Sequence, residues 1–177
     1  MFPKLTKKMR TRNFPLLVMM VIVITVGISI IQGPKAKPQA VMPKSICGDL
    51  LTEVITGAEA DKILTEMHGM GLATTQFEIG YYGAKADNNI LYLSIFPDEQ
   101  TAKQDYMSMS MKMANGTAVF SPLSVVHKED QVRFTTTGMG KMHFLYREKN
   151  ILIWWQGDST TMDAAIADLE QFSFSNR

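Results

Sequence analysis

The segment 106–113 reads YMSMSMKM, so that methionine recurs at every second position, as Met107, Met109, Met111 and Met113. A thioether sulfur is a soft ligand that favours Cu(I), and it stays uncharged at every pH. The string therefore points to a soft-metal site. Side chains elsewhere that could complete such a site are Cys47, His127, Met139, Met142 and His143.

The conformation of this string decides whether its sulfurs can meet. In an α-helix, residues two apart point about 200° away from each other, so only Met107 with Met111 and Met109 with Met113 face one another. In a strand, all four side chains would share one face. Asp98 can cap a helix here, and mixed charges follow it, so we expect a helix whose methionines fill the core and contact a neighbour. Metal binding is the alternative, because the string resembles the methionine-x-methionine strings of extracytoplasmic copper-handling proteins.

Aromatic residues in the predicted strands suggest a surface for a protein partner. Trp154 and Trp155 are neighbours on a strand, so they point to opposite faces of the sheet. We expect one of them to join the core beneath the helices. The other would lie with Tyr82 and Phe144 on an uncovered face, where aromatic residues mark contact surfaces. The alternative is that both tryptophans belong to the core.

Motifs of catalysis are absent from the sequence, which contains no HExxH, no glycine-rich phosphate loop and no GxSxG elbow. The acidic pairs Asp98-Glu99 and Glu129-Asp130 fall at a predicted helix start and a predicted turn. The single cysteine, Cys47, excludes an internal disulfide and any CxxC site. We therefore expect a non-enzymatic protein without a cofactor, copper being the alternative. A small hydrolase is a further hypothesis, because a catalytic triad is assembled in space.

The charge of the chain is divided between its two parts. Of 177 residues, residues 1–44 hold eight basic side chains and no acidic one. Residues 45–177 hold the other 10 of the 18 basic residues and all 17 acidic ones, a formal charge of −7. An acidic body does not suit a nucleic-acid-binding domain, which needs a basic face.

An uncharged segment at 14–31, FPLLVMMVIVITVGISII, is long enough to cross the roughly 30 Å apolar core of a bilayer as a helix. We expect a single transmembrane helix over 14–32 in the inner or plasma membrane. The five basic residues of the 1–13 tail would keep that tail cytoplasmic, which places the C-terminal domain in the periplasm or outside the cell. A cleaved signal peptide is the alternative, but the apolar run is long and no small-x-small site follows it.

Beyond the apolar segment, residues 33–44 read GPKAKPQAVMPK and predict a proline-rich linker. Residues 45–177 then form the extracytoplasmic domain. Their periodicity predicts helices at about 57–69, 98–114 and from 160 on, and strands at 75–82, 90–96, 123–127, 131–137, 141–147 and 150–156.

These elements predict an α+β domain with the order α-β-β-α-β-β-β-β-α, in which helices pack on one face of an antiparallel sheet. The strand ILIWW at 151–155 is apolar on both faces, so we expect it at the centre of the sheet. With the tether and no catalytic motif, the expected function is an accessory or interaction domain, a non-catalytic subunit of a larger membrane-associated assembly. The alternative is a Cu(I)-binding module that uses Met107, Met109, Met111 and Met113.

Overall fold

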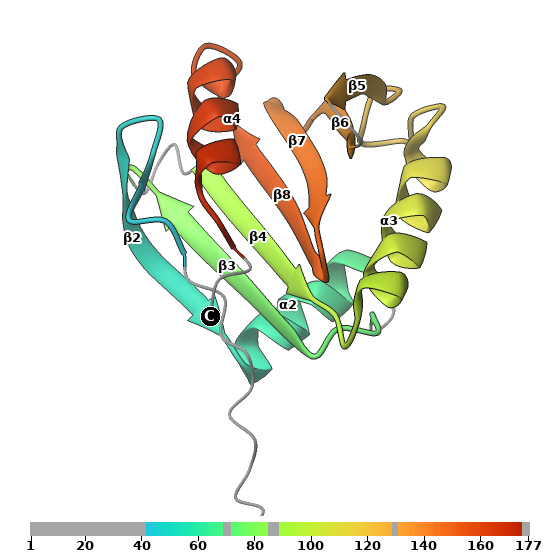
Figure 1. Ribbon diagram of the computed structural model, residues 1–177. Coiled ribbons are helices and arrows are strands. Elements are labelled where there is room, and N and C mark those ends of the chain that lie inside the picture. The colour runs from blue at the N-terminus through green and yellow to red at the C-terminus, as the bar shows by residue number, and fades with distance from the viewer. Residues whose placement is uncertain (1–41, 69–71, 85–88, 129–130, 175–177) are drawn as a thin grey trace, which may run out of the picture. The chain divides into compact units, whose positions relative to one another are not determined.

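The computed structural model describes residues 42–68, 72–84, 89–128 and 131–174, shown in colour in Figure 1. The expected cytoplasmic tail, the expected transmembrane helix and most of the expected linker lie outside the described residues. Within the described part, no helix is long and apolar enough to cross a membrane.

In the part of the chain that the structure describes, eight strands form one antiparallel sheet in the order β1-β2-β3-β4-β8-β7-β6-β5. The strands are β1 (Ser45–Ile46), β2 (Asp49–Thr56), β3 (Gln76–Tyr82), β4 (Asn89–Ile95), β5 (Ser124–Lys128), β6 (Gln131–Gly138), β7 (Lys141–Glu148) and β8 (Ile151–Gly157). The α+β class is confirmed, as are the antiparallel pairs β3–β4, β6–β7 and β7–β8.

Three helices accompany the sheet in the described residues: α2 (Ala58–His68), α3 (Glu99–Met113) and α4 (Met162–Gln171). The start of α3 is confirmed, because the Asp98 carboxylate accepts a hydrogen bond from the Thr101 backbone N–H at 2.8 Å. In α4, Met162, Ala165 and Leu169 are buried, and their spacing places them on one face of the helix.

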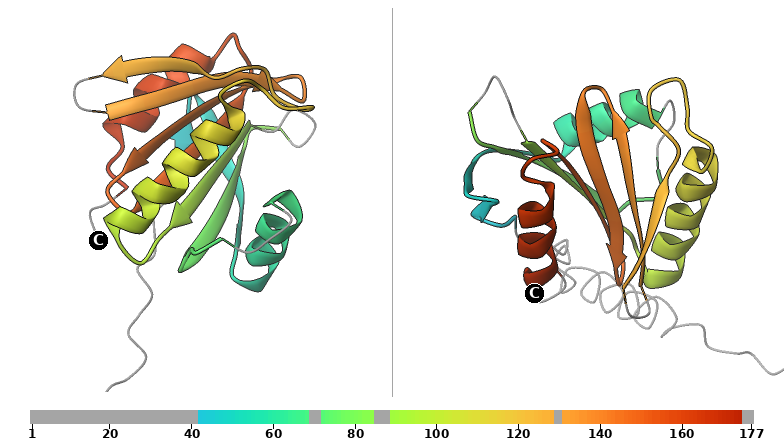
Figure 2. Two further views of the ribbon diagram at one scale, coloured as in Figure 1. Left: turned by 90° about the vertical axis from the view of Figure 1, so that its right-hand side faces the viewer. Right: turned by 90° about the horizontal axis from the view of Figure 1, so that it is seen from above.

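The helices lie on both faces of the sheet, and the prediction of a single covered face is wrong. α4 packs on the face that carries Ile153 and Trp155 of β8, whereas α3 packs on the face that carries Leu152 and Trp154. α2 shares the face of α3, since Tyr92 of β4 packs against the cores beneath both helices. Figure 2 shows α4 on the opposite side of the sheet from α2. Strand β8 is the reason, because it is apolar on both faces and each face must be removed from water.

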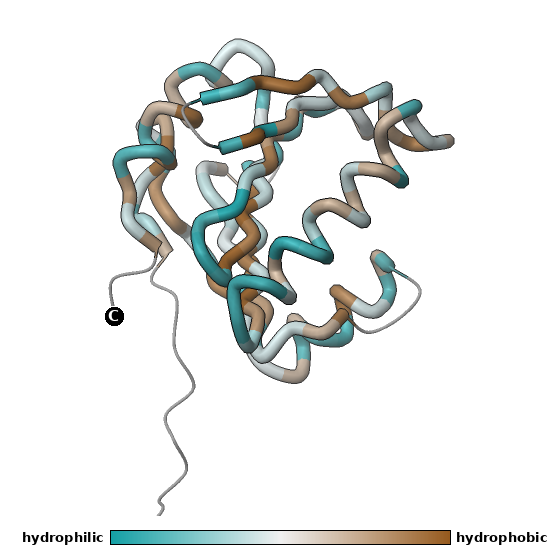
Figure 3. Tube along the Cα trace, turned by 45° about the vertical axis from the view of Figure 1, so that its right-hand side comes forward, coloured by the Kyte–Doolittle hydropathy of each residue, from teal (hydrophilic) through white to brown (hydrophobic). Residues whose placement is uncertain are grey.

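The central position of β8 is confirmed by its pairing with β4 on one side and β7 on the other. In Figure 3 the longest apolar stretches follow the strands, while polar residues recur along α3. All three helices therefore pack against the sheet, α4 on one face and α2 and α3 on the other.

The folded domain begins earlier than the sequence predicts and contains an additional hairpin. Strands β1 and β2 pair with each other, and β2 continues onto β3. Met42, which the sequence places in the linker, is buried in the core beneath α4. The hydroxyl of Tyr82 donates a 3.0 Å hydrogen bond to the carbonyl oxygen of Pro43. The end of the expected linker is thus part of the fold.

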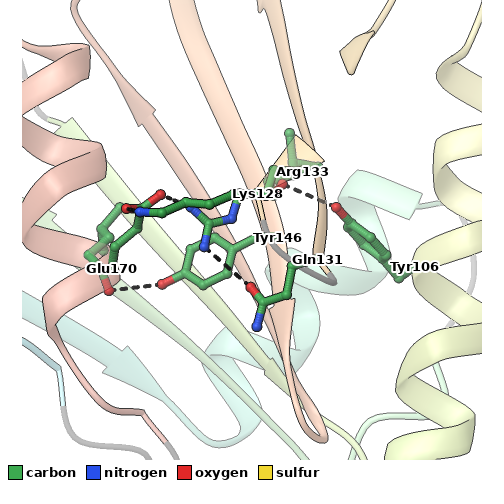
Figure 4. Close-up of polar contacts among 8 residues, drawn as sticks. Tyr106, Lys128, Gln131, Arg133, Tyr146 and Glu170 are labelled. Atoms are coloured by element: carbon green, nitrogen blue, oxygen red, sulfur yellow. Dashed lines mark hydrogen bonds and ion pairs between the residues drawn. The ribbon is translucent and has the colours of Figure 1, made fainter. Parts of the chain in front are cut away.

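A charged cluster fixes α4 to the end of the sheet (Figure 4). Glu170 of α4 forms ion pairs with Arg133 of β6 and Lys128 of β5. The Arg133 side chain is only 10% exposed, and its guanidinium carbon lies 5.6 Å from the centre of the Tyr146 ring. The hydroxyl of Tyr146 in turn donates to the carbonyl of Leu169 at 3.0 Å. One side chain of α4 therefore neutralises a largely buried cation of the sheet.

We predict that Glu170→Ala lowers the free energy of unfolding by about 3 kcal/mol, because it leaves Arg133 buried without a counter-charge. The double variant R133M/E170M is expected to recover most of the loss, since no buried charge remains. Urea unfolding of the full chain measures both.

The controls are Lys128→Met, whose side chain is 51% exposed, and Glu66→Ala, which breaks the exposed Lys62–Glu66 pair. Each is expected to change stability by less than about 1 kcal/mol. A cost for E170A no larger than these would contradict the assigned role of Glu170.

Candidate ligand-binding cleft

A cleft lies between α2 and α3 on the sheet face that these two helices share. It consists of two adjoining hollows of about 340 Å³ and 420 Å³. Six residues line both hollows: Met67, His68, Tyr92, Met109, Lys112 and Trp154. Volumes of this size are typical of small-molecule sites.

Aromatic side chains of the sheet form the floor of this cleft. The ring of Tyr92 lies 6.2 Å from that of Phe77, nearly parallel to it at 14°. Tyr92 also meets Trp154 edge to face at 6.4 Å, and Trp154 meets Phe120 at 5.8 Å. Phe120 pairs with Gly138 of β6 in an isolated bridge. The Phe120 ring can lie against β6 because residue 138 is a glycine, and a Cβ atom there would clash with the ring. These four rings, three from strands and Phe120 from the segment before β5, form a continuous aromatic row beneath the gap between the helices.

The methionine string contributes half of its members to the cleft. Met109 and Met113 line it, whereas Met107 and Met111 are 51% and 69% exposed on the other side of α3. This division follows the i,i+4 geometry of the helix that the sequence analysis predicts. Two further methionines join them from other elements: Met67 of α2, and Met139 of the β6–β7 turn.

The other candidate metal ligands are dispersed. Met139 and His143 reach the cleft, but Met142 packs in the core on the opposite face of the sheet. His127 is exposed on edge strand β5, and Cys47 lies in the β1–β2 turn, where its backbone N–H donates to Asp168 at 2.7 Å. Within the described residues, no three His, Cys, Asp or Glu side chains are grouped so as to hold a metal ion.

His143 is fully buried beside the cleft, and both of its ring nitrogens are engaged. Trp154 Nε1 donates to Nδ1 at 2.9 Å, so Nε2 carries the proton and donates to the carbonyl of Gly138 at 3.1 Å. The ring also meets Phe120 edge to face at 5.0 Å. Burial lowers the pKa of His143, with the Gly138 hydrogen bond acting in the opposite direction. His143 therefore orients the Trp154 ring as a neutral side chain.

Three titratable side chains line the cleft where the helices face each other: His68 from α2, and Asp105 and Lys112 from α3. Desolvation lowers the pKa of His68, and the charge of Lys112 lowers it further, while Asp105 acts in the opposite direction. The cleft accordingly combines an apolar interior with a few polar groups, an arrangement suited to binding.

The aromatic partner surface expected from the sequence is not present, because its four residues are buried. Trp155, Tyr82 and Phe144 are at most 2% exposed and pack beneath α4. Trp154 is 9% exposed and faces α3. The expectation that the two tryptophans point to opposite faces is confirmed, but helices cover both faces. Of the four residues, the structure brings only Trp154 to the cleft.

Several cleft residues carry no signal in the sequence that singles them out. Met67 and His68 read as an ordinary helix end, and Tyr92 as one residue of a buried strand. Phe120 lies between the helix predicted to end near 114 and the strand predicted at 123–127, outside any predicted element. Only the i,i+4 pair Met109 and Met113 could have been assigned to a shared face in advance.

We predict that acidification below about pH 6.5, the ordinary pKa of histidine, destabilises the protein partly through His143. The unfolded chain takes up the proton there, whereas folded His143 stays neutral to lower pH, so stability falls as pH falls through this window. Thermal unfolding of the full chain between pH 7.5 and 5.5 measures the effect.

The variant His143→Leu removes this titration and leaves Trp154 Nε1 without its acceptor. It is expected to cost about 1–3 kcal/mol at pH 7.5 and to reduce the pH dependence. His143→Gln, which keeps an acceptor, should cost less while reducing the pH dependence equally. An unchanged pH slope in both variants would show that His143 does not contribute to it.

Comparisons of the chain with models of protein families, with curated proteins and with solved structures find no match.

Proposed function

We propose that the described domain is a non-catalytic binding domain whose recognition site is the cleft between α2 and α3. The main observation behind this proposal is that four methionines from three separate elements line a cleft whose floor is aromatic. Methionine side chains have three rotatable bonds and a polarizable sulfur, so they adapt to ligands of different shape. Such walls suit an apolar group of a small molecule or of a partner protein.

The proposal includes the setting in which this site operates. The segment 14–32 holds the protein in the inner or plasma membrane, and the domain faces the periplasm or the exterior as an accessory subunit of a larger assembly. This placement in the membrane is supported by the uncharged length of the segment and by the basic residues that precede it. A lone monomer in gently solubilised native membranes would contradict the accessory role.

Methyl NMR of the methionines tests the binding site directly. The full chain, labelled with ¹³C at the methionine methyls and placed in phosphatidylcholine nanodiscs, is titrated with octan-1-ol. We expect shifts at Met67, Met109, Met113 and Met139, because the alcohol displaces water from the cleft. Met107 and Met111 lie on the exposed side of the same helix and report non-specific effects.

Matched variants sharpen the test. Met109→Gln places an amide in the cleft and is expected to weaken octan-1-ol binding about tenfold, whereas Met107→Gln should have no effect. Equal shifts at Met107, Met111 and the cleft methyls, or equal effects of the two variants, would refute the cleft as the binding site.

A soft-metal site in the same cleft is the second candidate function. The observation that favours it is that Met67, Met109, Met113 and Met139 line one hollow together with His68. Thioether and imidazole ligands suit Cu(I). The hollow is larger than the coordination shell of one ion, so the sulfurs would have to rotate inward.

A Cu(I) competition titration of the full chain decides this candidate. Binding tighter than micromolar is expected, and M109L/M113L should weaken it at least tenfold because two soft ligands are lost. The matched control M107L/M111L should bind as the native chain does. Absence of binding, or the same loss in both double variants, would exclude the metal site.

A further inference from the structure

The ligand chemistry of the cleft follows from the charges that line it, and this inference rests on the proposed binding function. The hollow that ends at Val119 and Met139 is lined by apolar side chains and a few polar ones. Among the described residues that line it, Lys112 alone carries a formal charge near neutral pH, since His68 and His143 both have lowered pKa values. Asp105 lines only the other hollow.

Lys112 also stands at the junction of the two hollows, because it lines both of them. Thr117 and Gln156, which line the same hollow as Val119, can donate further hydrogen bonds. The hollow thus offers an anionic oxygen one cation, Lys112, and two neutral donors, and no carboxylate is among the described residues that line it. A ligand cation there would meet the Lys112 charge at close range.

The two hollows succeed each other along α3, so an unbranched ligand whose polar end lies at their junction can extend into either of them. One hollow is lined by Leu72 and Phe96, and the other by Val119 and Met139, with Tyr92 and Trp154 shared between them. An unbranched aliphatic chain suits such a path, because the methionine walls can close around it.

We propose that the cleft binds an amphiphilic monocarboxylate, with its aliphatic chain over Tyr92 and Trp154 and its carboxylate beside Lys112. If Lys112 had a purely structural role, its replacement would affect all ligands alike. As a basic residue in the last turn of α3, it would stabilise the helix dipole without selecting between ligands.

The test compares three probes that share one chain length: octanoate, octan-1-ol and octylammonium. Each is titrated into the methionine-labelled full chain in phosphatidylcholine nanodiscs at pH 7.5. The shifts of the Met67, Met109, Met113 and Met139 methyls are followed. For each probe, the affinity ratio between native chain and variant cancels partitioning into the lipid.

The variant Lys112→Met should weaken octanoate binding about three- to tenfold more than octan-1-ol binding, as expected for a charge pair that involves an exposed lysine. It should strengthen octylammonium binding by removing a like charge. Lys103→Met is the matched control, because Lys103 is exposed on the same helix but does not line the cleft. All three affinities should be native in K103M.

Equal losses for octanoate and octan-1-ol in K112M, or no loss for either, would overturn the carboxylate proposal while leaving the apolar cleft intact. If none of the three probes shifts the cleft methyls of the native chain, the proposed binding function itself fails. The two failures are therefore distinguishable in one set of titrations.

Discussion

Strand β8 is apolar on both faces, and most of the fold follows from the need to remove both faces from water. Trp155 and Ile153 require α4, while Trp154 and Leu152 require α3. On the second of these faces, Phe77 and Ile79 of β3 pack against α2. Two helices share that face, and the gap between them is the cleft. The candidate site thus exists because the two helices on this face of the sheet leave part of it uncovered between them.

The polar groups near the cleft are arranged to keep its floor in place. Trp154 is oriented by a histidine whose two nitrogens are both used, so the indole presents its ring and not its N–H to the gap. On the far side of the sheet, the Arg133–Glu170 pair holds α4 against β6. Buried polar contacts here serve positioning, and they leave the cleft itself lined by groups that lose little on meeting an apolar ligand.

Local sequence patterns predicted the β3–β4, β6–β7 and β7–β8 hairpins, the Asp98 cap and the central place of β8, because each depends on neighbours in the sequence. The β1–β2 hairpin was missed because DLLTEVIT lacks a clean alternation and is mostly exposed. The prediction that helices cover one face of the sheet was wrong, although the strand ILIWW, which is apolar on both faces, already indicated that both faces must be buried. The division of the methionine string followed from helix geometry alone. The cleft could not be predicted, because Met67, Tyr92, Phe120 and Met139 are brought together only by the tertiary fold.

The pairing of β4 with β8 also governs the order in which the chain can fold. Residues 96–150 separate these two strands, so β4 stays an unpaired, apolar edge until β8 is available. At about 5–20 residues per second, synthesis leaves that edge open for roughly 3–11 s. The N-terminal half, with β1 to β4 and α2, therefore passes through a stage in which β4 is paired with β3 on one side only. A chain of this topology depends on protection against aggregation until its last strand arrives.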